Sequence, residues 1–211
     1  MNWYAGYGRG MTDGSESTVV SPERAAVLIP GGNYSTDAPL LNFTREAVDV
    51  REAYVEAIHW TPPDLEQAAF RNWLNGSESQ SWVCGQVSDA LERVAKQAPV
   101  AHTVLVGKSL GSRAVQVAAD RDLPAIWFTP LLYLADVAAA LRRCTAPFLL
   151  LGGTADESWD GSLARDLTPH VVELPGADHG LMLPGPLAAT FAAQSVALTA
   201  VEAFLDEVVW P

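Results

Sequence analysis

Short apolar segments alternate with amphipathic segments along most of the chain, and this alternation limits the fold more than any other feature. Most of the apolar segments lack polar residues at every second position, which is the pattern of strands buried on both faces. We predict strands at residues 25–29, 55–60, 102–106, 124–128, 147–151 and 170–174. Helices are expected at residues 37–50, 81–97, 112–119, 134–143, 158–167 and from 187 to about 209. The alternation therefore predicts an α/β domain whose mainly parallel sheet is covered by helices on both faces.

The length of the chain indicates one domain. A chain of 211 residues can bury a layered core, but it is short for two domains. We expect residues 25–211 to form this domain. Residues 1–24, rich in Gly, Ser and Thr, are expected to precede it as an extension with at most one short strand, at residues 17–20.

The composition excludes several classes of partner. The 13 Lys and Arg residues face 25 Asp and Glu residues, and a net charge of −12 argues against a nucleic-acid partner, which needs a basic face. The two cysteines, Cys84 and Cys144, have no metal-ligand spacing, and we interpret them as core residues. No apolar run approaches the roughly 18 residues of a membrane helix, and the N-terminus does not resemble a signal peptide. We expect a cytoplasmic protein with no membrane partner, metal or cofactor.

Residues 107–111, Gly-Lys-Ser-Leu-Gly, are the first candidate for chemistry. They stand between the strand predicted at residues 102–106 and the helix predicted at residues 112–119. A Gly-x-Ser-x-Gly sequence at such a junction is typical of a nucleophile elbow, which exposes the serine hydroxyl at the end of the sheet. We therefore predict that Ser109 is a nucleophile.

A serine nucleophile needs a base, and four histidines are available. His59 falls inside a predicted strand, and His102 and His170 begin strands at the opposite end of the sheet. His179 instead lies in a glycine-containing loop directly after the strand predicted at residues 170–174. Since function collects at the carboxyl ends of parallel strands, we predict that His179 is the base.

The base needs a carboxylate to orient it. Asp156 follows the strand predicted at residues 147–151, in a loop at the same end of the sheet. It could also cap the next helix. Glu157 and Asp160 remain alternatives, and Asp178 is less suitable because it is adjacent in sequence to His179. We predict the order Ser109, Asp156, His179, which is the chain order of nucleophile, acid and base in α/β-hydrolases.

Two backbone N–H groups should bind the oxyanion that forms during attack. The first is expected from Leu110, directly after the nucleophile. The second is expected from the turn after the first strand, where Gly32 is the preferred donor and Asn33 the next. Glycine in that turn also suits a simple tight turn.

Four motifs together give the chain a resemblance to the α/β-hydrolase superfamily, in particular to small, capless, dienelactone-hydrolase-like serine hydrolases. They are residues 29–33, 107–111, 153–156 and 177–180, and the resemblance covers about residues 25–209. Three departures stand out. Pro30 replaces the histidine of a His-Gly motif, the connection 128–134 is too short for a lid domain, and the first strands of the family's sheet are missing or reduced. An open or shallow pocket and short-chain substrates are expected.

The resemblance implies a serine hydrolase that cleaves an ester-like bond of a small substrate through an acyl-enzyme intermediate. Residues that could contact the substrate are Lys108, Thr129, Leu131 and Trp159. Each also suits an ordinary structural role, with Lys108 pairing to a neighbour and the other three in the core or at its rim. A non-catalytic binding module on a hydrolase scaffold, or an acyltransferase with the same triad, are the alternative functions. The sequence leaves the oligomeric state open.

Overall fold

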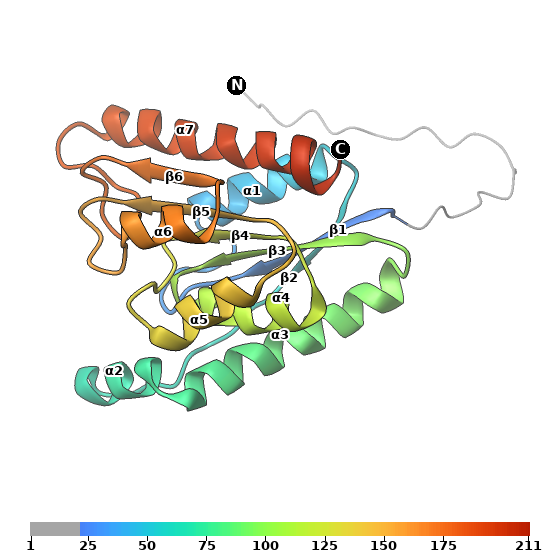
Figure 1. Cartoon of the computed structure of the whole chain (residues 1–211), viewed down its shortest axis with the longest axis horizontal. Coiled ribbons are helices and arrows are strands. Elements are labelled where there is room, and N and C mark those ends of the chain that lie inside the picture. Colours follow the sequence, from blue (N-terminus) through green and yellow to red (C-terminus); the bar gives the residue numbers. More distant parts are fainter. Residues whose placement is uncertain (1–21) are drawn as a thin grey trace, which may run out of the picture.

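A six-stranded parallel sheet lies at the centre of the structure, a computed structural model that describes residues 22–211 (Figure 1). The strand order is β2-β1-β3-β4-β5-β6, and all five neighbouring pairs are parallel. The strands are β1 (Arg24–Ile29), β2 (Tyr54–Ala57), β3 (His102–Lys108), β4 (Ala125–Phe128), β5 (Phe148–Gly153) and β6 (Val171–Leu174). The predicted parallel sheet is confirmed.

Helices cover both faces of the sheet, as predicted (Figure 1). One face packs against α3 (Ser77–Gln97), α4 (Val115–Arg121), α5 (Ala135–Arg143) and α6 (Gly161–Leu167). The other packs against α1 (Pro39–Asp49) and α7 (Leu187–Phe204). Successive residues of β1 explain the unbroken apolar runs, because Val27 belongs to one core cluster and Leu28 to the other.

The structure differs from the sequence-based expectation between β2 and α3. The strand predicted for residues 55–60 ends at Ala57, so His59 and Trp60 lie in the loop that follows. A helix that was not predicted, α2 (Gln67–Asn75), precedes α3. Only Trp73 of α2 is buried, which leaves little apolar periodicity to recognise. The segment after Ser109 also begins as a 3₁₀ helix, η1 (Ser109–Ala114), before α4.

The helix α7 is apolar over most of its length, although no apolar run of membrane-helix length was found in the sequence. Within residues 22–211, the segment Leu187–Val209 is the one helix that is long and apolar enough to cross a membrane, and 28% of its most apolar 18-residue stretch, of mean hydropathy 1.4, is buried. Thr, Gln and Ser interrupt its apolar residues, so no continuous run marks it in the sequence. In the fold it lies beside α1, β5 and β6, and continues as a π-helical turn, Leu205–Val209.

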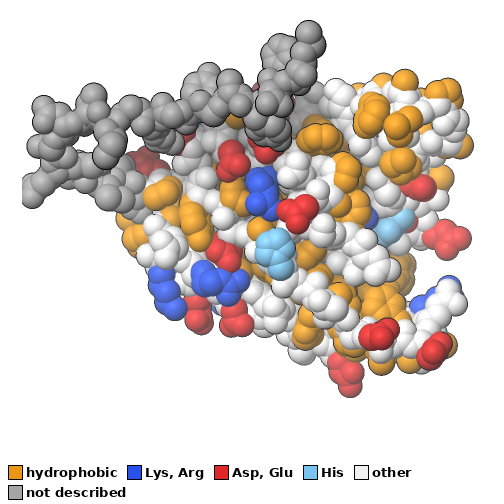
Figure 2. All heavy atoms as spheres, turned by 180° about the vertical axis from the view of Figure 1, so that it is seen from behind, with side chains coloured by type: hydrophobic (Ala, Val, Ile, Leu, Met, Phe, Trp, Pro, Cys, Tyr) orange, Lys and Arg blue, Asp and Glu red, His pale blue; other side chains and the backbone are white. Residues whose placement is uncertain are grey.

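Acidic and basic side chains are interspersed on the face seen from behind (Figure 2). Arg51, which follows α1, forms two hydrogen bonds of 2.6 and 2.7 Å with the Asp206 carboxylate in the turn after α7. Ion pairs with carboxylates also hold Arg45, Arg93, Arg113, Arg143 and Arg165. Much of the small basic content therefore joins secondary-structure elements to one another.

The expected boundary after residue 24 falls at the start of the sheet, since β1 begins at Arg24. The short strand expected at residues 17–20 lies outside the described residues. Cys84 and Cys144 are partly buried free thiols packed against the core. Burial raises the pKa of both.

Candidate active site

Ser109 lies in a strained turn where β3 ends and η1 begins. Its backbone φ is +52°, in the left-handed region that residues with a side chain rarely adopt. At the glycines on either side of Ser109, the surrounding atoms leave no room for a side chain. A Cβ on Gly107 would lie 2.5 Å from a ring carbon of Trp127, and a Cβ on Gly111 would lie 2.8 Å from the carbonyl oxygen of Pro30. The Gly-x-Ser-x-Gly sequence therefore forms an elbow of the geometry that it predicts.

Ser112 holds the elbow from within. Its hydroxyl donates to the carbonyl of Ser109 at 2.7 Å and accepts from the N–H of Leu131 at 3.1 Å. These bonds fix the turn against the segment that follows β4, so the Ser109 side chain has a defined direction.

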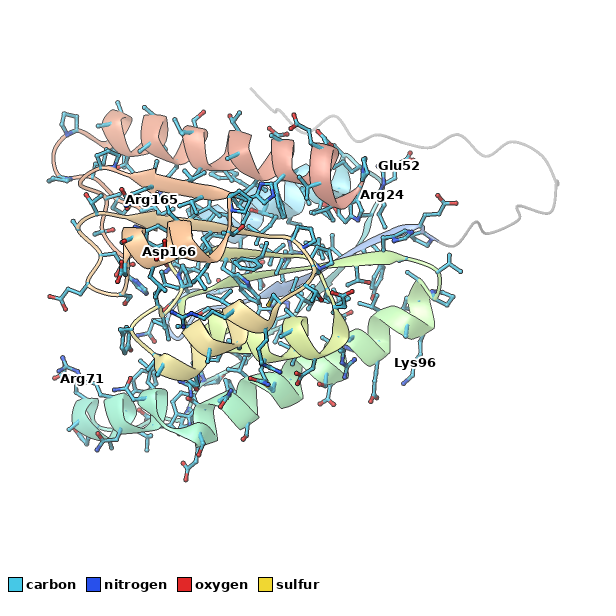
Figure 3. All side chains as sticks on the ribbon, viewed as in Figure 1. Arg24, Glu52, Arg71, Lys96, Arg165 and Asp166 are labelled. Atoms are coloured by element: carbon cyan, nitrogen blue, oxygen red, sulfur yellow. The ribbon has the colours of Figure 1, made fainter. Side chains whose placement is uncertain are left out.

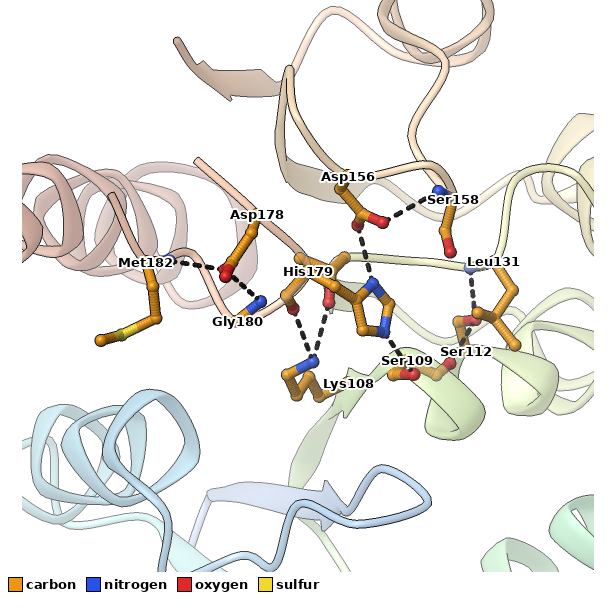
Figure 4. A network of polar contacts seen from close by, with 11 residues as sticks. Lys108, Ser109, Ser112, Leu131, Asp156, Ser158, Asp178, His179, Gly180 and Met182 are labelled. Atoms are coloured by element: carbon orange, nitrogen blue, oxygen red, sulfur yellow. Dashed lines mark hydrogen bonds and ion pairs between the residues drawn. The ribbon is translucent and has the colours of Figure 1, made fainter. Parts of the chain in front are cut away.

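The structure brings Ser109, His179 and Asp156 together in one hydrogen-bonded relay (Figure 4). His179 Nε2 lies 2.7 Å from Ser109 Oγ, and His179 Nδ1 lies 2.8 Å from Asp156 Oδ2. With the proton on Nδ1, the ring donates to the carboxylate and can accept the serine proton at Nε2. Three loops at the carboxyl ends of β3, β5 and β6 supply these groups.

The carboxylate of Asp156 is well placed to stay ionised. Its side chain is 2% exposed, and burial alone would raise its pKa. Hydrogen bonds from His179 and from the Ser158 N–H, the latter 2.8 Å long, outweigh burial and hold the pKa below its usual value. An ionised Asp156 can therefore orient His179 near neutral pH.

The rival carboxylates lie elsewhere. Asp160 caps α6 by accepting from the Leu163 N–H at 2.9 Å. Asp178 accepts from the N–H groups of Gly180 and Met182, so it shapes the histidine loop (Figure 4). Glu157 is exposed. Of these carboxylates, Asp156 alone forms a hydrogen bond with His179.

The turn after β1 approaches Ser109 closely. A Cβ on Gly31 would lie 3.5 Å from the Cβ of Ser109. Within residues 22–211, the N–H groups of Gly32 and Asn33 donate no intramolecular hydrogen bond, so both are available to a ligand. Leu110 lies in the first turn of η1, where a backbone N–H has no partner in the helix. The predicted oxyanion donors therefore come from two segments that meet at Ser109.

Lys108 is buried directly before Ser109 and is 2% exposed. Its Nζ donates to Thr129 Oγ1 at 3.0 Å and to the carbonyl of His179 at 2.9 Å, and it lies 4.9 Å from the centre of the Tyr34 ring. Burial lowers its pKa from 10.5 to about 8, against the opposing charge of Asp156. The amine therefore ties the histidine loop to the end of β4.

The other predicted substrate contacts are placed differently. Thr129 is fully buried and Leu131 is 3% exposed. The Trp159 ring packs over Gly152, and its indole N–H donates to Glu173 at 2.8 Å. None of these three, nor Lys108, lines the large cleft among the described residues, so a substrate-binding role for them stays a prediction.

A cleft of about 1060 Å³ opens beside the turn after β1. Its lining comes from residues 30–36, from the loop after β2 and from α2, and it includes Tyr34, Trp60 and Phe70. An open or shallow pocket was expected from the sequence, and this cleft is open to solvent, but its position was not predicted. The sequence signal that marks it is the set of aromatic residues between positions 60 and 82.

The remaining histidines lie apart from the relay. His59 is an exposed residue of the cleft lining. His102 begins β3, and His170 packs edge-on against Phe204 with ring centres 5.1 Å apart. Among residues 22–211, no group of three or more His, Cys, Asp and Glu side chains is arranged to hold a metal ion.

Comparison with solved structures identifies the fold. No protein-family model and no curated protein sequence matches the chain. A cold-adapted esterase from an Arctic intertidal metagenomic library is similar in structure, with TM-score 0.64, 17% identity, and 90% of this chain and 85% of that chain covered. A dienelactone hydrolase from Anabaena variabilis is similar with TM-score 0.62 and 18% identity, and the match covers 89% of this chain and 88% of that chain. A lidless α/β serine hydrolase from Xanthomonas campestris is similar with TM-score 0.60 and 15% identity, and the match covers 90% of this chain and 84% of that chain. The chain therefore has the α/β-hydrolase fold.

Proposed function

We propose that this protein is a serine hydrolase that cleaves an ester-like bond of a small substrate through an acyl-enzyme intermediate. The observation that supports this most is the relay from Ser109 Oγ through the His179 ring to Asp156, with hydrogen bonds of 2.7 and 2.8 Å. The esterases and serine hydrolases of similar structure add support at the level of the scaffold.

In the proposed mechanism, His179 Nε2 takes the hydroxyl proton as Ser109 Oγ attacks the substrate carbonyl. The Asp156 carboxylate holds the ring and stabilises the imidazolium that forms. The N–H groups of Leu110 and Gly32 bind the oxyanion, with that of Asn33 adjacent. The imidazolium then protonates the leaving group, and a water activated by the same ring releases the acid.

Labelling with a fluorophosphonate, followed by peptide mapping, tests the proposal. We expect modification of Ser109 that is lost in His179→Ala. Ser109→Ala should abolish ester turnover, and Asp156→Asn should lower kcat by a factor on the order of 10⁴, because the ring would lose its correct tautomer. A Ser109→Ala variant with the activity of the wild type would refute the mechanism, and absence of labelling would favour a binding module.

A further inference from the structure

The cleft begins at the turn after β1, which approaches Ser109, although Ser109 and His179 are not themselves in its lining. Four packed rings form an aromatic wall on one side of it: Trp60, Phe70, Trp73 and Trp82. Ring centres are 5.6 Å apart for Phe70 and Trp73, 5.6 Å for Trp73 and Trp82, and 4.9 Å for Trp82 and Trp60. Trp60 and Phe70 line the cleft, whereas Trp73 and Trp82 do not. Because the second pair packs against the first, the two lining rings have supported positions.

The aromatic wall is joined directly to the turn that approaches the nucleophile. The indole N–H of Trp60 donates to the carbonyl of Gly31 at 3.0 Å. A Cβ on Gly32 would lie 3.5 Å from the outermost ring carbon of Phe70. Since Gly31 also approaches Ser109, a substrate carbonyl at Ser109 would have the aromatic wall as its neighbour on the side of this turn.

The cleft lining contains few charged side chains. Asp64 is the one Asp, Glu, Lys or Arg residue in its lining, within the described part of the chain. Lys108, the cation nearest to Ser109 in the sequence, is buried and already donates to Thr129 and His179. Arg71 extends from α2 into solvent and does not line the cleft (Figure 3). A carboxylate on a substrate would therefore find no Lys or Arg in the described lining, where His59 is the one basic side chain, and it would meet a like charge at Asp64.

We infer that the cleft binds an uncharged aromatic group of the ester and discriminates against a carboxylate on that group. This inference rests on the proposed hydrolase function. An aromatic ring gains both burial of apolar area and ring-to-ring packing against Trp60 and Phe70. The ring can belong to the acid or to the alcohol of the ester, and the experiment separates these two sources.

The experiment compares kcat/KM for three neutral esters. Phenyl propanoate carries the ring on the alcohol, its isomer ethyl benzoate carries it on the acid, and ethyl propanoate has none. Phe70→Ala should lower kcat/KM about 10-fold for at least one aryl ester, since aromatic packing and burial are lost together. In the same variant, kcat/KM for ethyl propanoate should change less than about 2-fold. The aryl ester with the larger loss identifies the source of the ring.

Two further variants sharpen the comparison. Phe70→Leu keeps apolar volume but removes the ring, so its loss on the same aryl ester should be about 3-fold. Phe191→Ala removes an aromatic residue that is 57% exposed on α7, away from the cleft, and should leave all three values unchanged. Equal losses on all three esters in Phe70→Ala would overturn the inference, as would no loss on either aryl ester.

The charge arm needs only the wild type and one conservative variant. The aryl ester with the larger loss should react about 10-fold less efficiently when its ring carries a carboxylate in the para position. In Asp64→Asn the ratio of kcat/KM between the neutral and the carboxylated ester should fall about 2-fold, the size expected for one exposed like charge. A carboxylated ester that reacts as well as the neutral one would contradict the inference. If Ser109 is labelled by the fluorophosphonate but kcat/KM is the same for all these esters, the inference alone is refuted. If Ser109 is not labelled and no ester is turned over, the proposed function is refuted as well.

Discussion

Two buried cations lie on either side of Ser109 in the sequence, and their hydrogen-bond partners differ in kind. Lys108 ends β3 directly before Ser109 and is 2% exposed, while Arg113 lies in η1 and is 1% exposed. Lys108 donates to the Thr129 hydroxyl and the His179 carbonyl, which are neutral acceptors. Arg113 donates to the carbonyls of Leu74 and Gly76 and to the carboxylate of Asp136, at 2.9, 2.7 and 2.9 Å.

The partners show that the two cations join the elbow to different structures. Lys108 connects it to the loop that carries the proposed base. Arg113 connects it to the junction of α2 and α3, the helices that carry three of the four residues of the aromatic wall. Loss of Lys108 should therefore disturb the proposed chemistry, and loss of Arg113 should disturb the fold around the cleft.

The largest effect is expected from Arg113→Met. The variant leaves two carbonyls without their donor and a carboxylate without its cation, and we expect a loss of about 3–5 kcal/mol in the free energy of unfolding. Urea denaturation measures it. Arg143→Met is the matched control, because Arg143 and Asp120 form a pair that is about half exposed on both sides and should contribute less than about 1 kcal/mol. Similar losses of unfolding free energy in the two variants would show that the buried Arg113 contributes no more to stability than an exposed arginine.

The next effect is a dependence of stability on pH. The pKa of Lys108 is about 8 in the fold, against 10.5 for an unperturbed lysine, so the unfolded chain binds more protons between these two values. The contribution of Lys108 to stability should therefore rise from pH 8 to 10.5, by up to about 3 kcal/mol. Urea denaturation of the wild type and Lys108→Met across this window isolates the rise, which the variant should lack. If the unfolding free energies of the wild type and the variant change with pH in parallel, Lys108 has no lowered pKa.

The same variant should lower the turnover rate. In Lys108→Met the His179 loop loses its buried donor, so we expect kcat to fall about 10- to 30-fold with KM unchanged. The rate of fluorophosphonate labelling at Ser109 should fall in parallel, since it reports the serine and histidine without ester recognition. If Lys108 instead contacts a carboxylate of the substrate, KM should rise for acidic esters alone.

The sequence predicts the sheet and the relay because both depend on local patterns. Buried strands are apolar runs, and Ser109, Asp156 and His179 follow three of them at one end of a parallel sheet. The cleft wall could not be predicted in this way, because α2 has a single buried residue and its aromatic neighbours meet only in the tertiary structure. Likewise, nothing local distinguishes a buried Lys108 from an exposed one, since its partners are 21 and 71 residues away.

The smallest effect is expected from Thr129→Val, which keeps the branched shape and removes the hydroxyl that accepts from Lys108. The bond from Lys108 to the His179 carbonyl remains, so kcat should fall only about 3-fold, and Thr129→Ser should restore it. Steady-state kinetics on one short ester measures both. A rise in KM with unchanged kcat would support the substrate-binding role predicted for Thr129. A fall in kcat larger than that of Lys108→Met would show that Thr129 positions the site independently of the lysine.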